Sequence, residues 1–343
     1  AGAPWVAYRH FCEHFLGPLA LMAYCDIRYG LLLRNFVDGI PLDLVSATLP
    51  GRTRLRLGLL SHVHMHAAAQ RRHAGGGREA GERARRTKVS DLGQRALLDS
   101  LRRTVEQLRW EPRGTAWADY AENTSYSEPA TRAKREVVER FLSDAGGATV
   151  WDLGANVGVY SRLAATLGRD VVAFDVDPAA VERHWQALVR DRVGNVLPLI
   201  VDLMNPSPSL GWALAERRSL FERANADVVI ALALVHHLAI GRNVPLVMLS
   251  AFLARLAPHV VIEFVPKEDP MVQVLLATRE DVFPDYTLDG FRAAFATHFD
   301  FVDEIAIPSS RRIMFHLRRT ATRVGPASSV TMRVPTAPPP EPA

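Results

Sequence analysis

The sequence contains few cysteines, few lysines and no long apolar run. Two of its 343 residues are cysteine, Cys12 and Cys25, which is too few for a disulfide framework and favours a reducing compartment, the cytoplasm. The apolar run at 15–25 covers 11 residues and is followed by Asp26 and Arg28. It is too short to span a membrane, and it lacks the basic stretch that opens a signal peptide. A disulfide-stapled fold is excluded, and no membrane partner is expected.

Lysine is scarce although the chain carries 41 basic residues, of which only Lys88, Lys134 and Lys267 are lysines. The others are arginines scattered along the chain rather than along one face, so the formal net charge of +4 does not indicate a nucleic-acid partner. Apolar residues make up 48% and charged residues 23%, which is typical of a globular protein with a full core. At this length about two domains are expected.

Changes in composition divide the chain into five parts. The first is rich in leucine, histidine and aromatic residues, which indicates helices at 4–15, 19–36 and 42–49. Further helices are predicted from Ser90, a favourable N-cap, to about residue 110, and at 129–142. The predicted parts are a helical N-terminal region (1–70), a Gly/Arg-rich flexible linker (71–89), a helical segment (90–146), an α/β domain (147–319) and a Pro-rich disordered tail (320–343).

The α/β domain is predicted from apolar runs that alternate with helical stretches. Several runs are continuous rather than alternating, which is typical of parallel strands buried on both faces. A short turn at 308–310 joins the last two runs and indicates an antiparallel hairpin at a sheet edge. The fold class is a doubly wound α/β protein with a mostly parallel seven-stranded sheet, and the predicted strands lie at 149–153, 171–174, 196–201, 228–232, 260–265, 299–307 and 312–317.

The turn after the first predicted strand carries the chemistry. It reads Asp152-Leu153-Gly154-Ala155-Asn156-Val157-Gly158, and its glycines let a ligand approach the backbone at the carboxyl edge of the sheet. A dinucleotide-binding loop would need glycine at 156 and 159, where the chain has asparagine and valine. A nicotinamide-dependent oxidoreductase is therefore disfavoured.

The D-x-G-x-N-x-G pattern resembles motif I of class I S-adenosylmethionine (SAM)-dependent methyltransferases. The resemblance implies a class I methyltransferase-like fold and SAM as cofactor, with Asp152, Gly154, Asn156 and Gly158 beside its methionine part. Asp175 ends the second strand, where an acid accepts ribose hydroxyls in nucleotide-binding folds. In methyltransferases an acid placed like Asp202, at the end of the third strand, often receives the adenine amino group. The alternative is that these acids only cap strand ends.

Two further segments resemble parts of small-molecule methyltransferases. The segment after the fourth strand contains His236 and His237, either of which is a candidate general base facing the acceptor. The alternative is that both histidines cap or pack against the next helix. The segment 117–127 is expected to form a lid, with Trp117 and Tyr126 as candidates for contact with SAM or substrate.

A second cluster of histidines, His62, His64 and His66, has no accompanying carboxylates or cysteines. Within a predicted helix these side chains spread around the axis, so solvated or packed roles fit them better than metal binding, and no metal is expected.

Residues 1–70 resemble the section that precedes the methyltransferase domain in longer bacterial nodulation-type methyltransferase proteins, so they are expected to be the remnant of a larger lobe. The predicted function is methyl transfer from SAM to a small-molecule, natural-product or carbohydrate-like acceptor. Two alternatives stay open: a SAM-binding regulatory or scaffold domain without turnover, and an RNA or protein methyltransferase. The acceptor, the methylated atom and the oligomeric state are not determined by the sequence.

Overall fold

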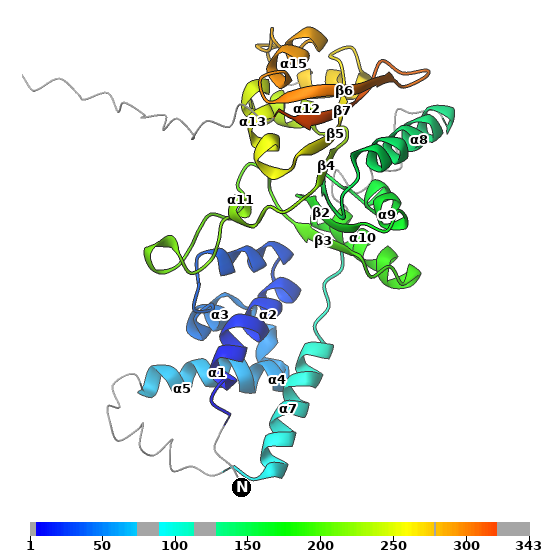
Figure 1. Ribbon diagram of the computed structural model, residues 1–343. Coiled ribbons are helices and arrows are strands. Elements are labelled where there is room, and N and C mark those ends of the chain that lie inside the picture. The colour runs from blue at the N-terminus through cyan, green and yellow to red at the C-terminus, as the bar shows by residue number, and fades with distance from the viewer. Residues whose placement is uncertain (1–4, 74–88, 113–127, 278, 321–343) are drawn as a thin grey trace, which may run out of the picture. The chain divides into compact units, whose positions relative to one another are not determined.

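The computed structural model describes residues 5–73, 89–112, 128–277 and 279–320 (Figure 1). These residues form two compact units. The first contains the N-terminal helices, α10 and the segment 198–223, and the second contains α8, α9 and the residues from 224 onward that carry β4 to β7. The predicted linker and tail, and the predicted lid residues Trp117 and Tyr126, lie outside or almost entirely outside the described residues.

A seven-stranded, mostly parallel sheet confirms the predicted α/β architecture. Its strand order is β3-β2-β1-β4-β5-β7-β6, and the pairs β1–β2, β1–β4 and β4–β5 are parallel. The last two strands form the predicted antiparallel hairpin, with β6 at the edge of the sheet. Every residue of β4 is buried, as its continuous apolar run predicts. The strands are β1 (Thr149–Leu153), β2 (Asp170–Asp175), β3 (Val196–Ile200), β4 (Val228–Ala231), β5 (His259–Phe264), β6 (Phe299–Ala306) and β7 (Ile313–Arg319).

The helices of the second unit pack on this sheet and on each other. Helix α8 contacts β5 and β7, and α13 contacts α15. An aromatic group that includes Phe291, Phe295 and Phe315 fills the space between α15 and the hairpin, with ring centroids 4.2 to 5.1 Å apart. These helices are α8 (Glu128–Ala145), α9 (Val159–Thr166), α12 (Val235–Ala239), α13 (Leu246–Leu256), α14 (Pro270–Leu276) and α15 (Leu288–Phe295).

The N-terminal helices of the first unit, α1 to α7, drawn in blue and cyan in Figure 1, enclose a second apolar core. Leu101 of α7 packs into it, and the side chain of Ser90 accepts a hydrogen bond from the Gly93 N–H, which confirms the predicted N-cap. A Cβ at Gly58 would lie 2.9 Å from the Thr104 Cβ, so glycine permits the close approach of α4 and α7. The N-terminal elements are α1 (Tyr8–Phe11), η1 (Cys12–Leu16), α2 (Gly17–Tyr24), η2 (Ile27–Arg34), α3 (Leu42–Thr48), η3 (Gly51–Leu55), α4 (Leu57–Leu59), η4 (Leu60–Met65), α5 (His66–His73) and α7 (Asp91–Glu106). The remaining helices of this unit are α10 (Pro178–Asp191), η5 (Trp212–Leu214) and α11 (Leu220–Arg223).

The prediction of one helix at 19–36 was wrong. Helix α2 ends at Tyr24, and Asp26 is extended, with φ −158° and ψ 139°. The Asp26 carboxylate accepts hydrogen bonds from the backbone N–H and the guanidinium of Arg28, so it caps a new, 3₁₀ helix (η2) instead of continuing the first. Upstream, the helix runs through Gly17-Pro18 rather than ending at 15. A π-helical turn (η1) precedes the proline, and such a turn accommodates the break that proline makes in the hydrogen-bond ladder.

His62 and His64 of the histidine cluster lie in η4 and are packed, which is one of the roles predicted for them. His62 lies between the Tyr8 hydroxyl at 2.8 Å and the Ser100 hydroxyl at 2.9 Å. His64 lies in the same way between Ser46 and Thr53. Burial lowers the pKa of both imidazoles, so they act as neutral hydrogen-bonding groups within the helical core.

No helix in the described part of the chain is both long enough and apolar enough to cross a lipid bilayer.

Candidate functional site

The loop between β1 and α9 has an unusual backbone. Gly154, Asn156 and Gly158 all have left-handed conformations, with φ of +73°, +49° and +74°. The N–H groups of Gly154 and Ala155 both donate to the Phe174 carbonyl of β2, at 2.9 and 3.0 Å. The loop is therefore fixed to the carboxyl end of the neighbouring strand, one residue before Asp175.

Gly154 also allows a close approach from the loop after β4, the strand that pairs with β1. A Cβ at this position would lie 3.2 Å from Cδ1 of Leu234, which follows β4. The loop after β1 and the loop after β4 thus meet across the carboxyl edge of the sheet, where open α/β sheets bind their ligands.

Asp152 lies at this edge with its side chain buried. Its Oδ2 accepts a hydrogen bond of 2.6 Å from the hydroxyl of Ser161, which is itself fully buried in α9. This contact ties the end of β1 to the helix that follows the glycine loop. In the structure Asp152 therefore holds the two ends of the loop in a fixed geometry.

Asp175 ends β2 and is partly exposed. Its Oδ1 accepts the Asp177 N–H at 2.8 Å, and its carbonyl accepts the Val201 N–H at 2.8 Å. Asp177 caps α10 through the Ala179 N–H, with Pro178 in the first turn.

Asp202 comes two residues after the end of β3. It directly follows Val201, whose N–H donates to the Asp175 carbonyl. Its Oδ1 accepts the Met204 N–H at 2.9 Å, and its other oxygen makes no hydrogen bond within the residues that the structure describes. The side chain is partly exposed. A carboxylate oxygen in this state can accept a hydrogen bond from a ligand amino group.

The two candidate histidines lie in different environments. His236 is completely buried, and neither ring nitrogen has a hydrogen-bond partner among the described residues. His237 is partly exposed, and the two ring centroids lie 4.1 Å apart. Burial, helped by the positive charge of Arg312, lowers the pKa of His237 to about 4 and that of His236 well below its usual range. Both imidazoles are neutral at pH 7, and His237 is the one that a ligand can reach.

A buried ionic cluster behind these histidines was not predicted from the sequence. Lys134 of α8 donates to Oε2 of Glu263 at 2.7 Å, and Arg312 donates to Asp269 at 2.7 Å and lies 3.7 Å from Glu263. All four side chains are at least nine-tenths buried. The signal in the sequence was Glu263 itself, a carboxylate inside the apolar run of β5.

Glu263 connects this cluster to the histidine loop. Its Oε2 also accepts the N–H of Ala233 at 2.8 Å, and Ala233 has a left-handed φ of +50°. A non-glycine residue in this conformation carries strain that the surrounding structure must offset. The Lys134–Glu263 pair therefore supports the turn that places His236 and His237.

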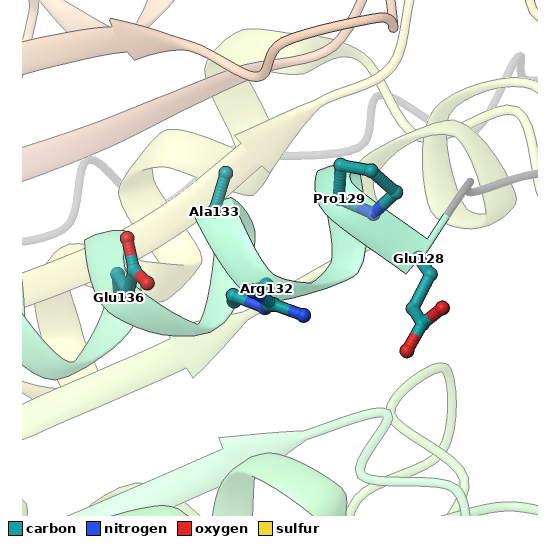
Figure 2. Close-up of a pocket in the computed structure, with 5 residues that line it drawn as sticks. All are labelled: Glu128, Pro129, Arg132, Ala133 and Glu136. Carbon is teal, nitrogen blue, oxygen red and sulfur yellow. The ribbon is translucent and has the colours of Figure 1, made fainter.

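A hollow of about 200 Å³ lies along the first turns of α8 (Figure 2). Its lining comes only from α8 and includes Glu128, Arg132 and Glu136. It contains no residue of the glycine loop or of the histidine loop, and it is smaller than pockets that usually take drug-sized ligands. We assign it no part in the site.

Within the described ranges, no three His, Cys, Asp or Glu side chains are grouped so that they could hold a metal ion.

These features define an α/β protein with a Rossmann-like sheet, a glycine loop after its first strand and acids after its second and third. No protein-family model matches the chain. It is 34% identical over 332 residues to the Nodulation protein NoeA of Rhizobium meliloti (strain 1021), a match that covers 93% of this chain and 67% of that protein. The chain belongs to the family of this nodulation protein, which confirms the predicted resemblance to longer nodulation-type proteins.

Several solved structures are similar over part of the chain. The N-methyltransferase NodS from Bradyrhizobium japonicum WM9 is 11% identical, with 56% of this chain and 98% of that chain covered and a TM-score of 0.42. Magnesium protoporphyrin IX methyltransferase (ChlM) from Synechocystis PCC 6803 is 18% identical, with 62% and 90% covered and a TM-score of 0.40. WbdD in complex with a kinase inhibitor is 15% identical, with 58% and 43% covered and a TM-score of 0.42. At these TM-scores the likeness is partial.

Proposed function

We propose that the chain is a SAM-dependent methyltransferase that acts on a small-molecule, natural-product or carbohydrate-like acceptor. The observation that carries the proposal is the glycine loop after β1, fixed by two hydrogen bonds to the end of β2, with acids at the ends of three strands. Acids and glycines at the carboxyl edge of a parallel sheet suit a nucleoside with a charged amino-acid portion.

Each part of SAM has its own set of residues in this proposal. The methionine part lies against Asp152, Gly154, Asn156 and Gly158. Asp175 accepts the ribose hydroxyls, and Asp202 accepts the adenine amino group. These assignments follow from the resemblance to class I methyltransferases and from the order of the strands.

The side chains suit this cofactor. Gly154 and Gly158 present bare backbone in left-handed conformations, and the left-handed φ of Asn156 keeps the turn tight. One carboxylate oxygen of Asp202 can accept a hydrogen bond from the adenine amino group. Asp175 is partly exposed at the end of β2. When bound, SAM supplies a methyl group on a positively charged sulfur for in-line displacement by an acceptor atom.

The protein's own contribution is then alignment and proton removal. Alignment of two reactants in a fixed geometry is worth roughly 7–11 kcal/mol in favourable cases, and a positioned base adds about 10²–10⁴-fold. We assign the base role to His237, because its side chain is partly exposed whereas that of His236 is completely buried. His236 contacts the ring of His237 from a fully buried position, so its part is to hold that ring in place.

Methyl transfer is tested by release of S-adenosylhomocysteine from SAM in the presence of pooled sugars, amino sugars, phenols and amines. The proposal predicts turnover with at least one pool, a loss of about 10²-fold or more in His237→Ala, and unchanged S-adenosylhomocysteine binding in that variant. Binding without turnover in any pool supports the alternative of a SAM-binding scaffold. Turnover only with RNA or protein, weakened steeply by salt for RNA, supports the other alternative.

The proposal places the reaction in the cytoplasm. Its support is that Cys12 and Cys25 are both free thiols, the first buried and the second exposed.

A further inference from the structure

A second hollow lies within the first unit, and its lining includes no residue of the glycine loop or of the histidine loop. Its volume is about 640 Å³, in the range of small-molecule sites. One wall is the last turn of η2, residues 30–34. The other wall is the segment that leaves β3, between 200 and 223.

Four arginines line this hollow, and no acidic residue does. Arg34 comes from η2, and Arg217, Arg218 and Arg223 come from the segment after β3. In the described part of the chain, none of them forms an ion pair with a carboxylate within 4 Å. Like charges held close together repel one another, so this arrangement favours a bound anion.

Backbone contacts hold two of these guanidinium groups in place. Arg34 donates to the Asn205 carbonyl at 2.8 Å, and Arg217 donates to the carbonyls of Leu33 and Val37 at 3.3 and 3.0 Å. Each wall thus binds the backbone of the other. Because carbonyl groups carry no net charge, these bonds fix the arginines without neutralising them.

Glu222, an acid of the same segment, makes its hydrogen bonds to serines. Its Oε2 accepts hydrogen bonds from the hydroxyls of Ser219 and Ser209 and from the Ser219 N–H, and these bonds, with a smaller contribution from the charge of Arg218, lower its pKa to about 2. Arg223 donates instead to the Ser207 hydroxyl at 2.6 Å. The carboxylate therefore organises the loop, while the guanidinium groups remain available to a ligand.

The loop that carries Arg217 is strained. Ala213 and Leu214 both have left-handed backbones, with φ of +54° and +57°, between Leu210 and Arg217, whose backbones pair through hydrogen bonds of 3.0 and 3.1 Å. Strain of this kind costs about 1–3 kcal/mol per residue and concentrates at functional sites. Here it turns the chain so that Arg217 and Arg218 reach the hollow.

We propose that this hollow is a binding site for an amphiphilic anion, a small molecule that joins a phosphate, sulfate or carboxylate group to an apolar portion. Guanidinium groups bind such oxyanions with paired, charge-assisted hydrogen bonds. Leu31, Leu33 and Leu210 of the same lining provide the apolar surface. The site shares no residue with the proposed SAM site, so it adds a second ligand to the methyl-transfer proposal.

Isothermal titration with octyl phosphate, octyl sulfate and octanoate, each below its micelle-forming concentration, tests this site. Octyl glucoside serves as the uncharged probe with the same chain. At least one anionic probe is expected to bind with a Kd in the micromolar to low millimolar range. Its affinity should fall as the NaCl concentration rises. Octyl glucoside should bind at least tenfold more weakly. The order among the three anions identifies the head group.

The double variant Arg218→Gln/Arg223→Gln is expected to bind the anionic probe with at least tenfold lower affinity. The matched control, Arg102→Gln/Arg103→Gln, removes two exposed arginines from α7 and is expected to bind as the unmodified chain does. Thermal melting and S-adenosylhomocysteine binding are measured for both, so a misfolded variant or an absent SAM site is recognised separately. Equal binding of the glucoside, equal loss in both double variants, or no binding of any anion would overturn the proposal.

Discussion

Lys134 and Glu263 lie 129 positions apart in the chain, yet their side chains form a buried ion pair of 2.7 Å. Neither side chain is more than 6% exposed. Because Glu263 also accepts the Ala233 N–H, the pair joins α8, β5 and the turn that precedes the two histidines. The site is therefore supported by a contact between elements that only the complete fold brings together.

Replacement of Lys134 by methionine should be strongly destabilising. It leaves the Glu263 carboxylate buried, with Arg312 as its remaining cation at 3.7 Å. Loss of one partner of a buried ion pair lowers the free energy of unfolding by about 3–5 kcal/mol. Urea denaturation of the variant and of the unmodified chain measures this difference. The double variant Lys134→Met/Glu263→Gln should recover part of this loss, because glutamine is neutral and still accepts the Ala233 N–H.

Lys267 provides the matched control for this experiment. It forms an ion pair of the same length with Asp281, but at the surface. Lys267→Met should leave the unfolding midpoint almost unchanged. Equal effects of the two lysine variants would contradict the role assigned to the buried pair.

Gly154→Ala should lower both the stability of the chain and its affinity for S-adenosylhomocysteine. Alanine at φ +73° costs about 1 kcal/mol in stability, and its Cβ would press on Leu234. Affinity for S-adenosylhomocysteine should fall at least tenfold, as measured by calorimetry.

Gly168→Ala is the control for Gly154→Ala. It imposes the same strain at φ +78°, but nothing lies within 4 Å of the added Cβ. It should lose similar stability and keep full affinity. A loss of affinity in both variants would attribute the effect to strain alone.

The buried histidines should make stability depend on pH. The pKa of His237 is lowered to about 4 and that of His236 well below its usual value, so the unfolded chain binds protons first as the pH falls below about 6.5. The free energy of unfolding should therefore decrease between pH 6.5 and about 4, by up to about 1.4 kcal/mol per pH unit for each such histidine.

His236→Gln removes one of these titrating groups and should flatten the decrease, even if it lowers stability at pH 7. The control His10→Gln changes an exposed histidine and should leave the slope as it is. Urea unfolding at several pH values between 4.5 and 7.5 measures both slopes. Identical slopes in the two variants would show that His236 is not held neutral by burial.

Most of the sheet was predictable because its signals are local. Continuous apolar runs mark the parallel strands, and the turn at 308–310 marks the hairpin. The caps at Ser90 and Asp177 follow from side chains that bond within three residues. The glycine loop was predictable for the same reason, since its conformation depends on residue types that tolerate positive φ.

Other features were not predicted. The apolar content of 19–36 suits one long helix, although the cap that Asp26 makes with the Arg28 N–H, which divides it, is also a local contact. The two histidines depend instead on contacts between elements far apart in the sequence. Adjacent histidines point about 100° apart on a helix, so burial of His236 and exposure of His237 depend on what α12 packs against. The roles of Trp117 and Tyr126 in a lid stay predictions.

The central claim is that the carboxyl edge of the sheet binds SAM, and titration of the chain with S-adenosylhomocysteine and with NADH tests it most directly. We expect micromolar binding of S-adenosylhomocysteine alone, weakened at least tenfold by Asp175→Asn at the carboxyl end of β2. The matched variant Asp170→Asn, at the amino end of the same strand, should bind normally. Binding of NADH instead, or equal affinity of both variants and the unmodified chain, would contradict this account.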